Sequence, residues 1–308
     1  MKIALPQWKL VGWRRRAAYV AFFVAAFVVA LRLTFPVEAV KERILLDAAA
    51  QGLQVKMNDI APAGLVGVRA REMSVVTANG TRIPIEDLRV SLRLLPTLLG
   101  HRAVSFDAAL YDGRITGTTD ESKTSQRYKV RIEGIDLARA AAVQQATGLE
   151  LAGKVGGNVD VTLDPKDPSK STGNVDLQVQ GAAIRGGKVP VPGMEGGLTV
   201  PPIRIGNVAA KGALKNGRAD FGTLEAKGDD LELSADQVFV QLQPKLEYSP
   251  LNGRARVRPL DAFWRKPQVS ALRPVIEAAL ASAKGRDGAY GFQVYGTIGK
   301  PQARPMAF

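Results

Sequence analysis

Few residues in this sequence have the type and spacing that catalysis requires. The chain has no cysteine and a single histidine, His101, which follows a short apolar stretch. One imidazole cannot form a histidine metal cluster, and neither a Ser-x-Gly nucleophile elbow nor a paired-carboxylate helix motif accompanies it. The absence of cysteine also excludes disulfides, thiolate metal sites and a cysteine nucleophile. We therefore interpret His101 as a surface residue and predict that the protein is not an enzyme.

Two further patterns suggest ligand binding, and each lacks a required part. Asp160, Asp164 and Asp167 offer oxygen ligands for a hard cation, but the fixed glycine and the terminal glutamate of a calcium loop are missing. The glycine sets within 153–157 and 181–187 do not lie between a strand and a helix that begins with Lys-Ser/Thr, as a phosphate loop requires. We expect neither a metal nor a cofactor.

Three arginines form the most regular charged group. Arg254, Arg256 and Arg258 alternate with Ala255 and Val257, so in a strand the arginines share one face. A solvated face is the simpler interpretation, and docking against anionic headgroups or an acidic partner is the alternative. Of the net charge of +13, five charges lie in residues 1–16 and the remaining +8 is spread widely, and only 6% of residues are aromatic. Both observations argue against nucleic acid as a partner.

One apolar segment predicts a membrane anchor. Residues 17–31 are apolar without interruption, and a helix that continues to Phe35 would cover roughly 28 Å, close to the thickness of bilayer hydrocarbon. A cleavable signal peptide begins in the same way, but residues 31–36 are bulky and charged where a small-x-small cleavage site would be needed. Five basic residues and no acidic residue precede the segment. The positive-inside bias therefore places the N-terminus in the cytoplasm and the large domain, in a bacterium, in the periplasm.

The predicted organisation has four parts. Residues 1–16 form a basic cytoplasmic segment, residues 17–35 the transmembrane anchor, residues 36–52 a stalk helix, and residues 53–308 a β-rich periplasmic domain. The stalk is expected because Pro36 suits a first helical position, apolar residues follow at helical spacing, and Gly52 is placed to end the helix.

From residue 53 onward the hydrophobic pattern alternates, which is typical of strands with one buried and one solvated face. The segment that begins Gly157-Asn158 returns at Gly173-Asn174, and we interpret the two copies as neighbouring strands joined by a polar loop. We expect a mainly β, hairpin-rich antiparallel sheet. Its alternating apolar residues include Leu88, Val90, Leu92, Val159, Val161, Leu163, Val175, Leu177 and Val179.

Turn and helix signals complete the expected architecture. Asp136 can cap a helix from Leu137 to Thr147, Ser270 can open a segment that runs to Lys284, and the Gly- and Pro-rich residues 181–202 form a loop or the softest part of the sheet. Five Asn-Gly or Asp-Gly pairs predict tight hairpin turns. They begin at Asn79, Asp112, Asn216, Asn252 and Asp287.

Several short phrases resemble known families. The run 85–100, an alternating strand followed by a leucine-rich turn, with Val104-Ser105-Phe106 after it, is similar to the AsmA-like group of periplasmic proteins. The segments 216–221, 227–230 and 291–301 resemble the carboxy-terminal half of GspN, the N component of type II secretion. The AsmA-like resemblance implies a sheet curled into an elongated groove lined by the alternating apolar residues, although a sandwich has the same alternation.

The resemblance and the anchor lead to two functional hypotheses. The first is a structural or accessory subunit of the type II secretion machinery of the bacterial inner membrane, with other secretion components as partners. The second is an AsmA-like lipid-binding or lipid-transfer protein that holds membrane lipid in an apolar β-groove. The resemblance supplies no catalytic residues.

Overall fold

The computed structural model describes residues 22, 37–50, 52–64, 66–77, 80–98, 100–122, 124–191 and 194–307. Apart from Phe22, the predicted anchor lies outside these residues. Within the described ranges, no helix is both long enough and apolar enough to cross a bilayer. Helix α2 (Val37–Ala50) occupies the range expected for the stalk, and Gly52 follows it with φ of +75°. Its role as a stalk stays a prediction.

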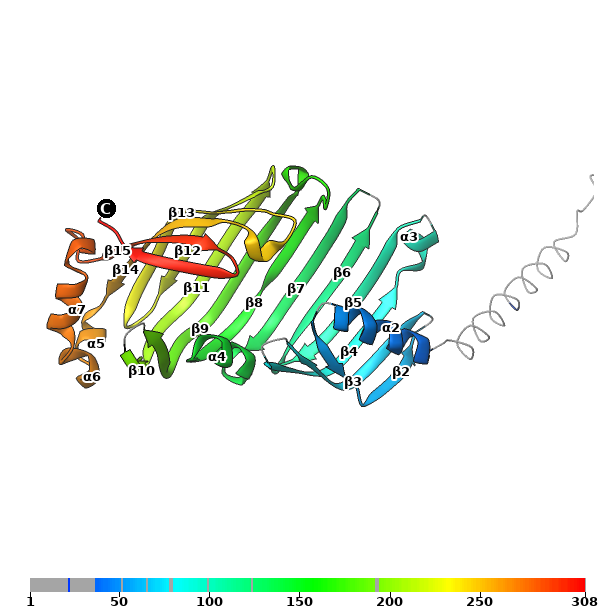
Figure 1. The fold of residues 1–308 in the computed structure, drawn as a ribbon, viewed down its shortest axis with the longest axis horizontal. Helices are drawn as coiled ribbons and strands as arrows, with labels where there is room; N and C mark the ends of the chain where they lie inside the picture. The colour runs from blue at the N-terminus through cyan, green and yellow to red at the C-terminus, as the bar shows by residue number, and fades with distance from the viewer. Residues whose placement is uncertain are drawn as a thin grey trace, which may run out of the picture.

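The strands of the described residues form one antiparallel sheet of 16 strands (Figure 1). Strand order along the sheet follows the chain, except that β2 pairs only with β3 and β10 only with β9, so that β11 pairs with β9. The sandwich alternative is therefore wrong, because all these strands join a single sheet. The strands are β1 (Gln54–Lys56), β2 (Asp59–Ala63), β3 (Gly67–Val76), β4 (Arg82–Leu92), β5 (Arg102–Leu110), β6 (Gly113–Glu121), β7 (Gln126–Asp136), β8 (Leu149–Leu163), β9 (Thr172–Val191), β10 (Met194–Thr199), β11 (Ile203–Lys215), β12 (Arg218–Lys227), β13 (Leu231–Gln241), β14 (Leu251–Pro259), β15 (Tyr290–Thr297) and β16 (Lys300–Pro305).

Short helices lie at the ends of strands. Asp136 caps η1 as predicted, because its carboxylate accepts a hydrogen bond from the backbone N–H of Ala138, and Gly148 ends α4 in the left-handed region. Ser270 does not open a helix; it is the last residue of α6, and α7 begins at Arg273. The helices are α3 (Leu94–Leu98), η1 (Leu137–Arg139), α4 (Ala141–Thr147), η2 (Pro168–Lys170), η3 (Leu246–Tyr248), α5 (Asp261–Trp264), α6 (Pro267–Ser270), α7 (Arg273–Ala279) and η4 (Ala281–Ala283).

The two predicted neighbouring strands, β8 and β9, are confirmed as the longest pair in the sheet. Val159 lies opposite Val175, and Asn158 opposite Asp176. The range 181–202 is not a loop, because β9 continues through it to Val191 and pairs with β10. Gly186 and Gly187 have positive φ within β9, a backbone conformation that glycine adopts readily and that is common where a strand bends.

The predicted turns divide into confirmed and corrected cases. Asn216-Gly217 is confirmed: both residues have positive φ, and the strands pair on either side of them. In the β5–β6 hairpin the positive φ angles fall on Tyr111 and Asp112, one position before the predicted Asp112-Gly113 pair. Positive φ at two central residues matches the right-handed twist of the flanking strands.

Asn252-Gly253 is not a turn and lies inside β14. Asn252 pairs with Phe239 on one side, and Gly253 pairs with Val294 on the other. A Cβ on Gly253 would approach Cγ2 of Val238 to 2.7 Å, so the glycine lets the neighbouring strand's side chain lie close to the backbone. The prediction was wrong because glycine serves close packing here and not a turn.

Among the described residues, fully buried apolar side chains are few and are scattered over many strands, from β3 to β15. One buried cluster consists of Tyr111, Ile135 and Ala140, and Val143 of α4 packs against it together with Ile115 and Ile132 of the sheet. Figure 1 shows α2 and α4 in front of the sheet, with β15 and β16 curling across the same side. Most apolar residues of the central strands are half-buried and do not belong to a closed core.

Candidate functional site: an apolar face of the sheet

The strand register joins apolar residues of successive strands into a continuous central row. Residues directly opposite each other in an antiparallel pair point to the same face of the sheet, so this row lies on one face. The row crosses ten strands, from β3 to β13. Its members are Val68, Val90, Phe106, Gly117, Val130, Val159, Val175, Gly212, Phe221 and Val238.

Two flanking rows lie on the same face, because their members are two residues away along each strand or pair across a bulge. The first consists of Ala70, Leu88, Ala108, Ile115, Ile132, Gly157, Leu177, Ala210 and Leu224. The second consists of Leu92, Val104, Thr119, Tyr128, Val161, Gly173, Leu214, Ala219, Val240 and Leu251. We call the three rows together the apolar face.

Seven of the nine apolar residues singled out in the sequence belong to these rows, and Leu163 and Val179 lie two residues beyond them on the same side of β8 and β9. Val90, Val159 and Val175 share the central row, and the other six lie beside it on the same three strands, β4, β8 and β9. Eight of the nine are half-buried, and Leu92 is 48% exposed. Neighbouring side chains shield them in part, but in the described residues no second sheet packs over them. Helix α4 covers part of the apolar face, because Val143 packs with Ile115 and Ile132 against the buried cluster. The role of these residues in lining a groove stays a prediction.

Two phenylalanines lie flat on the apolar face across glycines of the next strand. A Cβ on Gly117 would lie 2.5 Å from Cζ of Phe106, and a Cβ on Gly212 would lie 2.8 Å from Cδ1 of Phe221. The sequence analysis missed both pairs. For Gly212 and Phe221 a signal existed, because the Asn216-Gly217 turn fixes the hairpin register that places them opposite each other.

The opposite face of the sheet is polar and cross-linked by ion pairs. Arg69 and Asp87 form a bidentate pair with N···O distances of 2.5 and 3.0 Å, and Arg127 binds Asp160 at 3.2 Å. These hydrogen bonds lower the pKa of both carboxyl groups. Asp160 is thus held by a cation, and no cluster of potential metal ligands exists in the described part of the chain.

The three alternating arginines lie on the exposed side of β14, as expected. Arg258 contacts Glu232 and Asp287, and Arg256 lies 3.6 Å from Asp287. The backbone N–H of Ala289, and then Arg258 and Arg256, lower the pKa of Asp287. Acidic partners thus already engage two of the three arginines, which agrees with the solvated-face interpretation. Their docking against an anionic surface stays a prediction.

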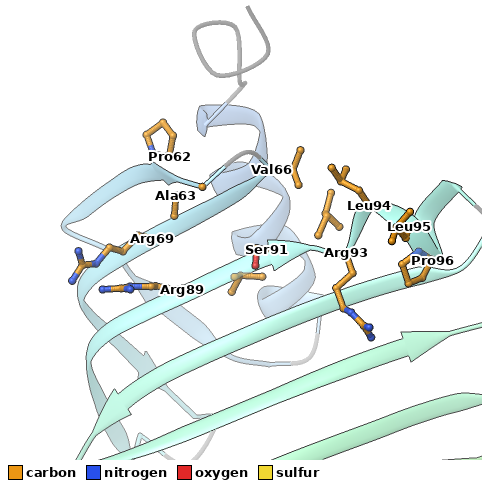
Figure 2. Close-up of a pocket in the computed structure, with 13 residues that line it drawn as sticks. Pro62, Ala63, Val66, Arg69, Arg89, Ser91, Arg93, Leu94, Leu95 and Pro96 are labelled. Atoms are coloured by element: carbon orange, nitrogen blue, oxygen red, sulfur yellow. The ribbon is translucent and has the colours of Figure 1, made fainter. Parts of the chain in front are cut away.

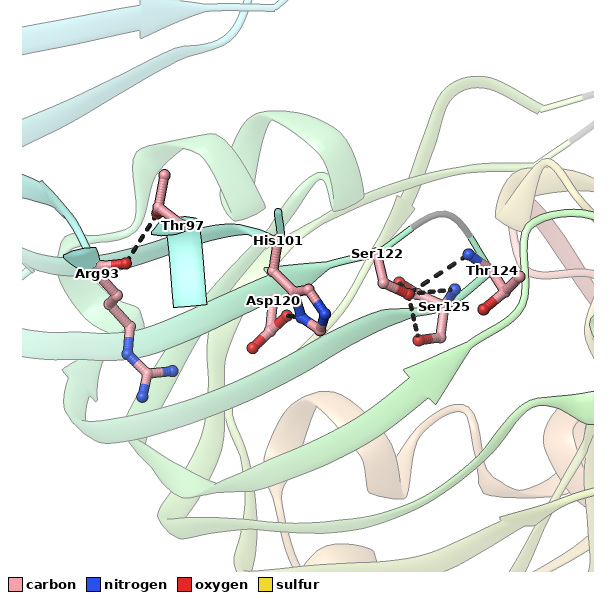
Figure 3. Close-up of polar contacts among 7 residues, drawn as sticks. All are labelled: Arg93, Thr97, His101, Asp120, Ser122, Thr124 and Ser125. Carbon is pink, nitrogen blue, oxygen red and sulfur yellow. Dashed lines mark hydrogen bonds and ion pairs between the residues drawn. The ribbon is translucent and has the colours of Figure 1, made fainter. Parts of the chain in front are cut away.

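His101 is an exposed residue at the start of β5. Its Nδ1 lies 2.9 Å from a carboxylate oxygen of Asp120 on β6, as Figure 3 shows. No serine or cysteine takes part in this contact. The geometry is that of a surface pair that joins two strand ends.

The fold and the rows define a class: an extended single-sheet β-protein with one open apolar face and one ion-paired polar face. Residues 73–182 match the family model described as YdbH-like, Intermembrane phospholipid transport protein YdbH. This segment extends from β3 into β9 and includes most of the residues singled out for the apolar face. No curated protein and no solved structure matches the chain.

Proposed function

We propose that this protein binds phospholipids by their acyl chains on the apolar face and moves them through the cell envelope. The observation that carries the proposal is the continuous central row across ten strands, in which Val68 is buried and the other nine residues are half-buried. Half-exposed apolar surface of this extent is costly in water, and each methylene that it covers gains about 0.8 kcal/mol. The match of residues 73–182 to a phospholipid transport family supports the same function.

The dimensions of the row suit more than one acyl chain. Ten strands are separated by nine spacings of about 4.8 Å, which gives a row of roughly 43 Å. An acyl chain spans half of a bilayer core, about 15 Å. The apolar face is thus a track along which a chain can lie at several positions. The polar face, with its ion pairs, remains in contact with water.

The test compares one substitution placed on the two faces of the same strand. Val159→Asp puts a carboxylate into the central row, whereas Asn158→Asp puts it on the polar face beside Arg131. The full chain is purified in mild detergent, and its bound phospholipid is quantified by mass spectrometry. We expect Val159→Asp to lower the lipid-to-protein ratio several-fold and Asn158→Asp to leave it unchanged. Equal ratios in both variants, or no lipid in the unaltered protein, would contradict the proposal.

The type II secretion hypothesis is not supported by the family match. It stays a prediction from short sequence phrases, and it has its own measurement. If the protein serves secretion, deletion of its gene should retain secreted hydrolases inside the cell. Normal hydrolase levels in the medium, together with altered phospholipid distribution between the membranes, would favour lipid transport.

A further inference from the structure

The turn between β4 and β5 exposes large apolar side chains at one end of the apolar face. We call residues 92–102 the leucine turn. Leu92, Leu94 and Leu95 are 48%, 44% and 78% exposed. The turn is nevertheless tightly bonded, because the hydroxyl of Thr97 donates to the carbonyl of Arg93 at 2.8 Å (Figure 3). In addition, the N–H of Arg93 donates to the carbonyl of Ala103 on β5. The hydrogen bonds of the turn therefore hold the backbone in a conformation that exposes these leucine side chains to solvent.

The chain segment of the leucine turn carries only basic charges, and its acidic neighbours are Asp120 and Glu121 on β6, with Glu121 opposite Arg102. No acidic residue occurs between Leu88 and Phe106, whereas Arg89, Arg93 and Arg102 do. Of these, Arg89 pairs with Asp87, while Arg93 and Arg102 form no ion pair with any other described residue. The acidic side chains nearest in register, on β6, are engaged elsewhere: Asp120 contacts His101, and Glu121 accepts a hydrogen bond from Gln126.

A depression of about 790 Å³ connects the leucine turn to the rest of the sheet. Figure 2 shows Leu94, Leu95 and Pro96 on one side of it, and Pro62, Ala63 and Val66 on another. Arg69, Arg89 and Ser91 line it as well; Arg89 and Ser91 alternate with Val90 and Leu92, and Arg69 lies opposite Arg89, so all three point to the polar face. The volume is in the range of small-molecule sites, so the depression beside the leucine turn is large enough for part of a lipid.

We propose that the leucine turn docks on the surface of an anionic phospholipid bilayer. This inference rests on the proposed function. Exposed leucines next to unpaired arginines match a bilayer interface, where apolar side chains enter the acyl boundary and cations contact phosphates. The described domain begins with α2, whose 14 residues extend about 21 Å, directly after the predicted anchor. The leucine turn is therefore within reach of the membrane that the anchor would occupy.

The experiment uses the absence of cysteine, which makes single-site labelling clean. Leu95→Cys and, as a control, Thr124→Cys in the exposed β6–β7 turn are each labelled with an environment-sensitive fluorophore. Both full-length proteins are reconstituted into vesicles of phosphatidylcholine, with or without phosphatidylglycerol. We expect the label at position 95 to shift to the blue and to be quenched by brominated lipid, most strongly with phosphatidylglycerol, while the label at position 124 stays in water.

A second pair of variants tests the charge. Arg93→Glu with Arg102→Glu should return the label at position 95 to a water-like emission, whereas Arg139→Glu, at the opposite ends of the strands, should not. A label at position 95 that stays as solvated as the one at position 124, or that is protected only by a soluble acidic protein, overturns the proposal. Bound phospholipid is measured on the same samples. If the protein binds phospholipid but the label at position 95 stays in water, the docking proposal alone is refuted. If the label is embedded but the protein binds no phospholipid, the proposed function alone is refuted.

Discussion

Asp230 is the residue on which the C-terminal end of the sheet depends most. It is completely buried in the turn between β12 and β13. One of its carboxylate oxygens accepts hydrogen bonds from the N–H of Arg204 at 2.5 Å and from the ammonium of Lys266, and the other has no partner among the described residues. Lys266 also donates to the carbonyl of Pro202. A single buried carboxylate thus joins the start of β11, the β12–β13 turn and the α5–α6 segment.

Removal of the lysine should destabilise the fold strongly. Lys266→Met leaves Asp230 buried with only the Arg204 guanidinium, 3.9 Å away, as a cation, and a broken buried pair typically costs about 3–5 kcal/mol. Lys284→Met is the matched control, because Lys284 pairs with Glu277 at the surface, where a pair contributes only about 0–1 kcal/mol. Urea denaturation of the two full-length variants measures the difference. Equal midpoints would show that the Asp230–Lys266 pair does not hold this end together.

The same pair predicts how stability depends on pH. Burial by itself would raise the pKa of Asp230, but the hydrogen bonds from Lys266 and Arg204 outweigh it and the pKa is lowered. A carboxyl group with a lowered pKa contributes its full stability above its unfolded pKa of about 3.9, and this contribution is lost as the pH falls through the folded value. The stability gap between the unaltered protein and Asp230→Asn should therefore be constant above about pH 5 and shrink between about pH 5 and pH 3. A gap that is constant over this range in thermal melts would contradict the assignment.

At the scale of the elements, the β11–β12 hairpin shows how the apolar face is built. Gly212 leaves space for the ring of Phe221, which lies flat and covers backbone that a glycine alone would expose. An aromatic ring across a glycine of the next strand is a known way to stabilise a sheet. Because the ring of Phe221 occupies the space over Gly212, the glycine leaves no gap in this part of the apolar face.

A methyl group at Gly212 should disturb this hairpin. In Gly212→Ala the new Cβ would lie 2.8 and 3.0 Å from two ring atoms of Phe221, and overpacking of this kind costs about 1–3 kcal/mol. Gly222→Ala is the control, since nothing lies within 4 Å of its Cβ position. Combination with Phe221→Leu should recover part of the loss, because the two positions are in contact. Purely additive costs in denaturation would rule out the contact.

The elements also show what the sequence can and cannot predict. Alternation identified β4, β8 and β9 and the face of each residue, because side-chain direction in a strand alternates by geometry. It could not decide between one layer and two, since a sandwich has the same period. Gly253 and Ser270 were misassigned because close packing and a break between helices leave the same local signals as a turn and a cap. The Asp230–Lys266 contact joins residues 36 positions apart, which no local pattern reveals.

For the whole molecule, the proposed function predicts that lipid movement depends on the continuity of the central row. Val130 lies near the middle, between Gly117 and Val159. Val130→Asp should interrupt the row, because a carboxylate in apolar surroundings is costly for an acyl chain to pass. Thr118→Asp is the control, as it lies opposite Lys129 on the polar face.

The two variants are compared by transfer of labelled phospholipid between vesicles and by bound lipid in the purified protein. We expect Val130→Asp to slow transfer several-fold while some lipid remains bound at the flanks of the row, and Thr118→Asp to behave as the unaltered protein. Unchanged transfer in Val130→Asp would show that lipid does not travel along the row.

The sequential order of the strands has a consequence for cooperativity. Almost every strand pairs only with its predecessor and its successor in the chain, so its stability is set by two neighbours, as in linear repeat proteins. In such a sheet, local unfolding of one strand destabilises its two neighbours, and the effect on more distant strands is smaller. Amide exchange after a substitution in β5 should accelerate in β4 and β6 and leave β13 unchanged. The protein can therefore loosen at one end while the other end stays folded.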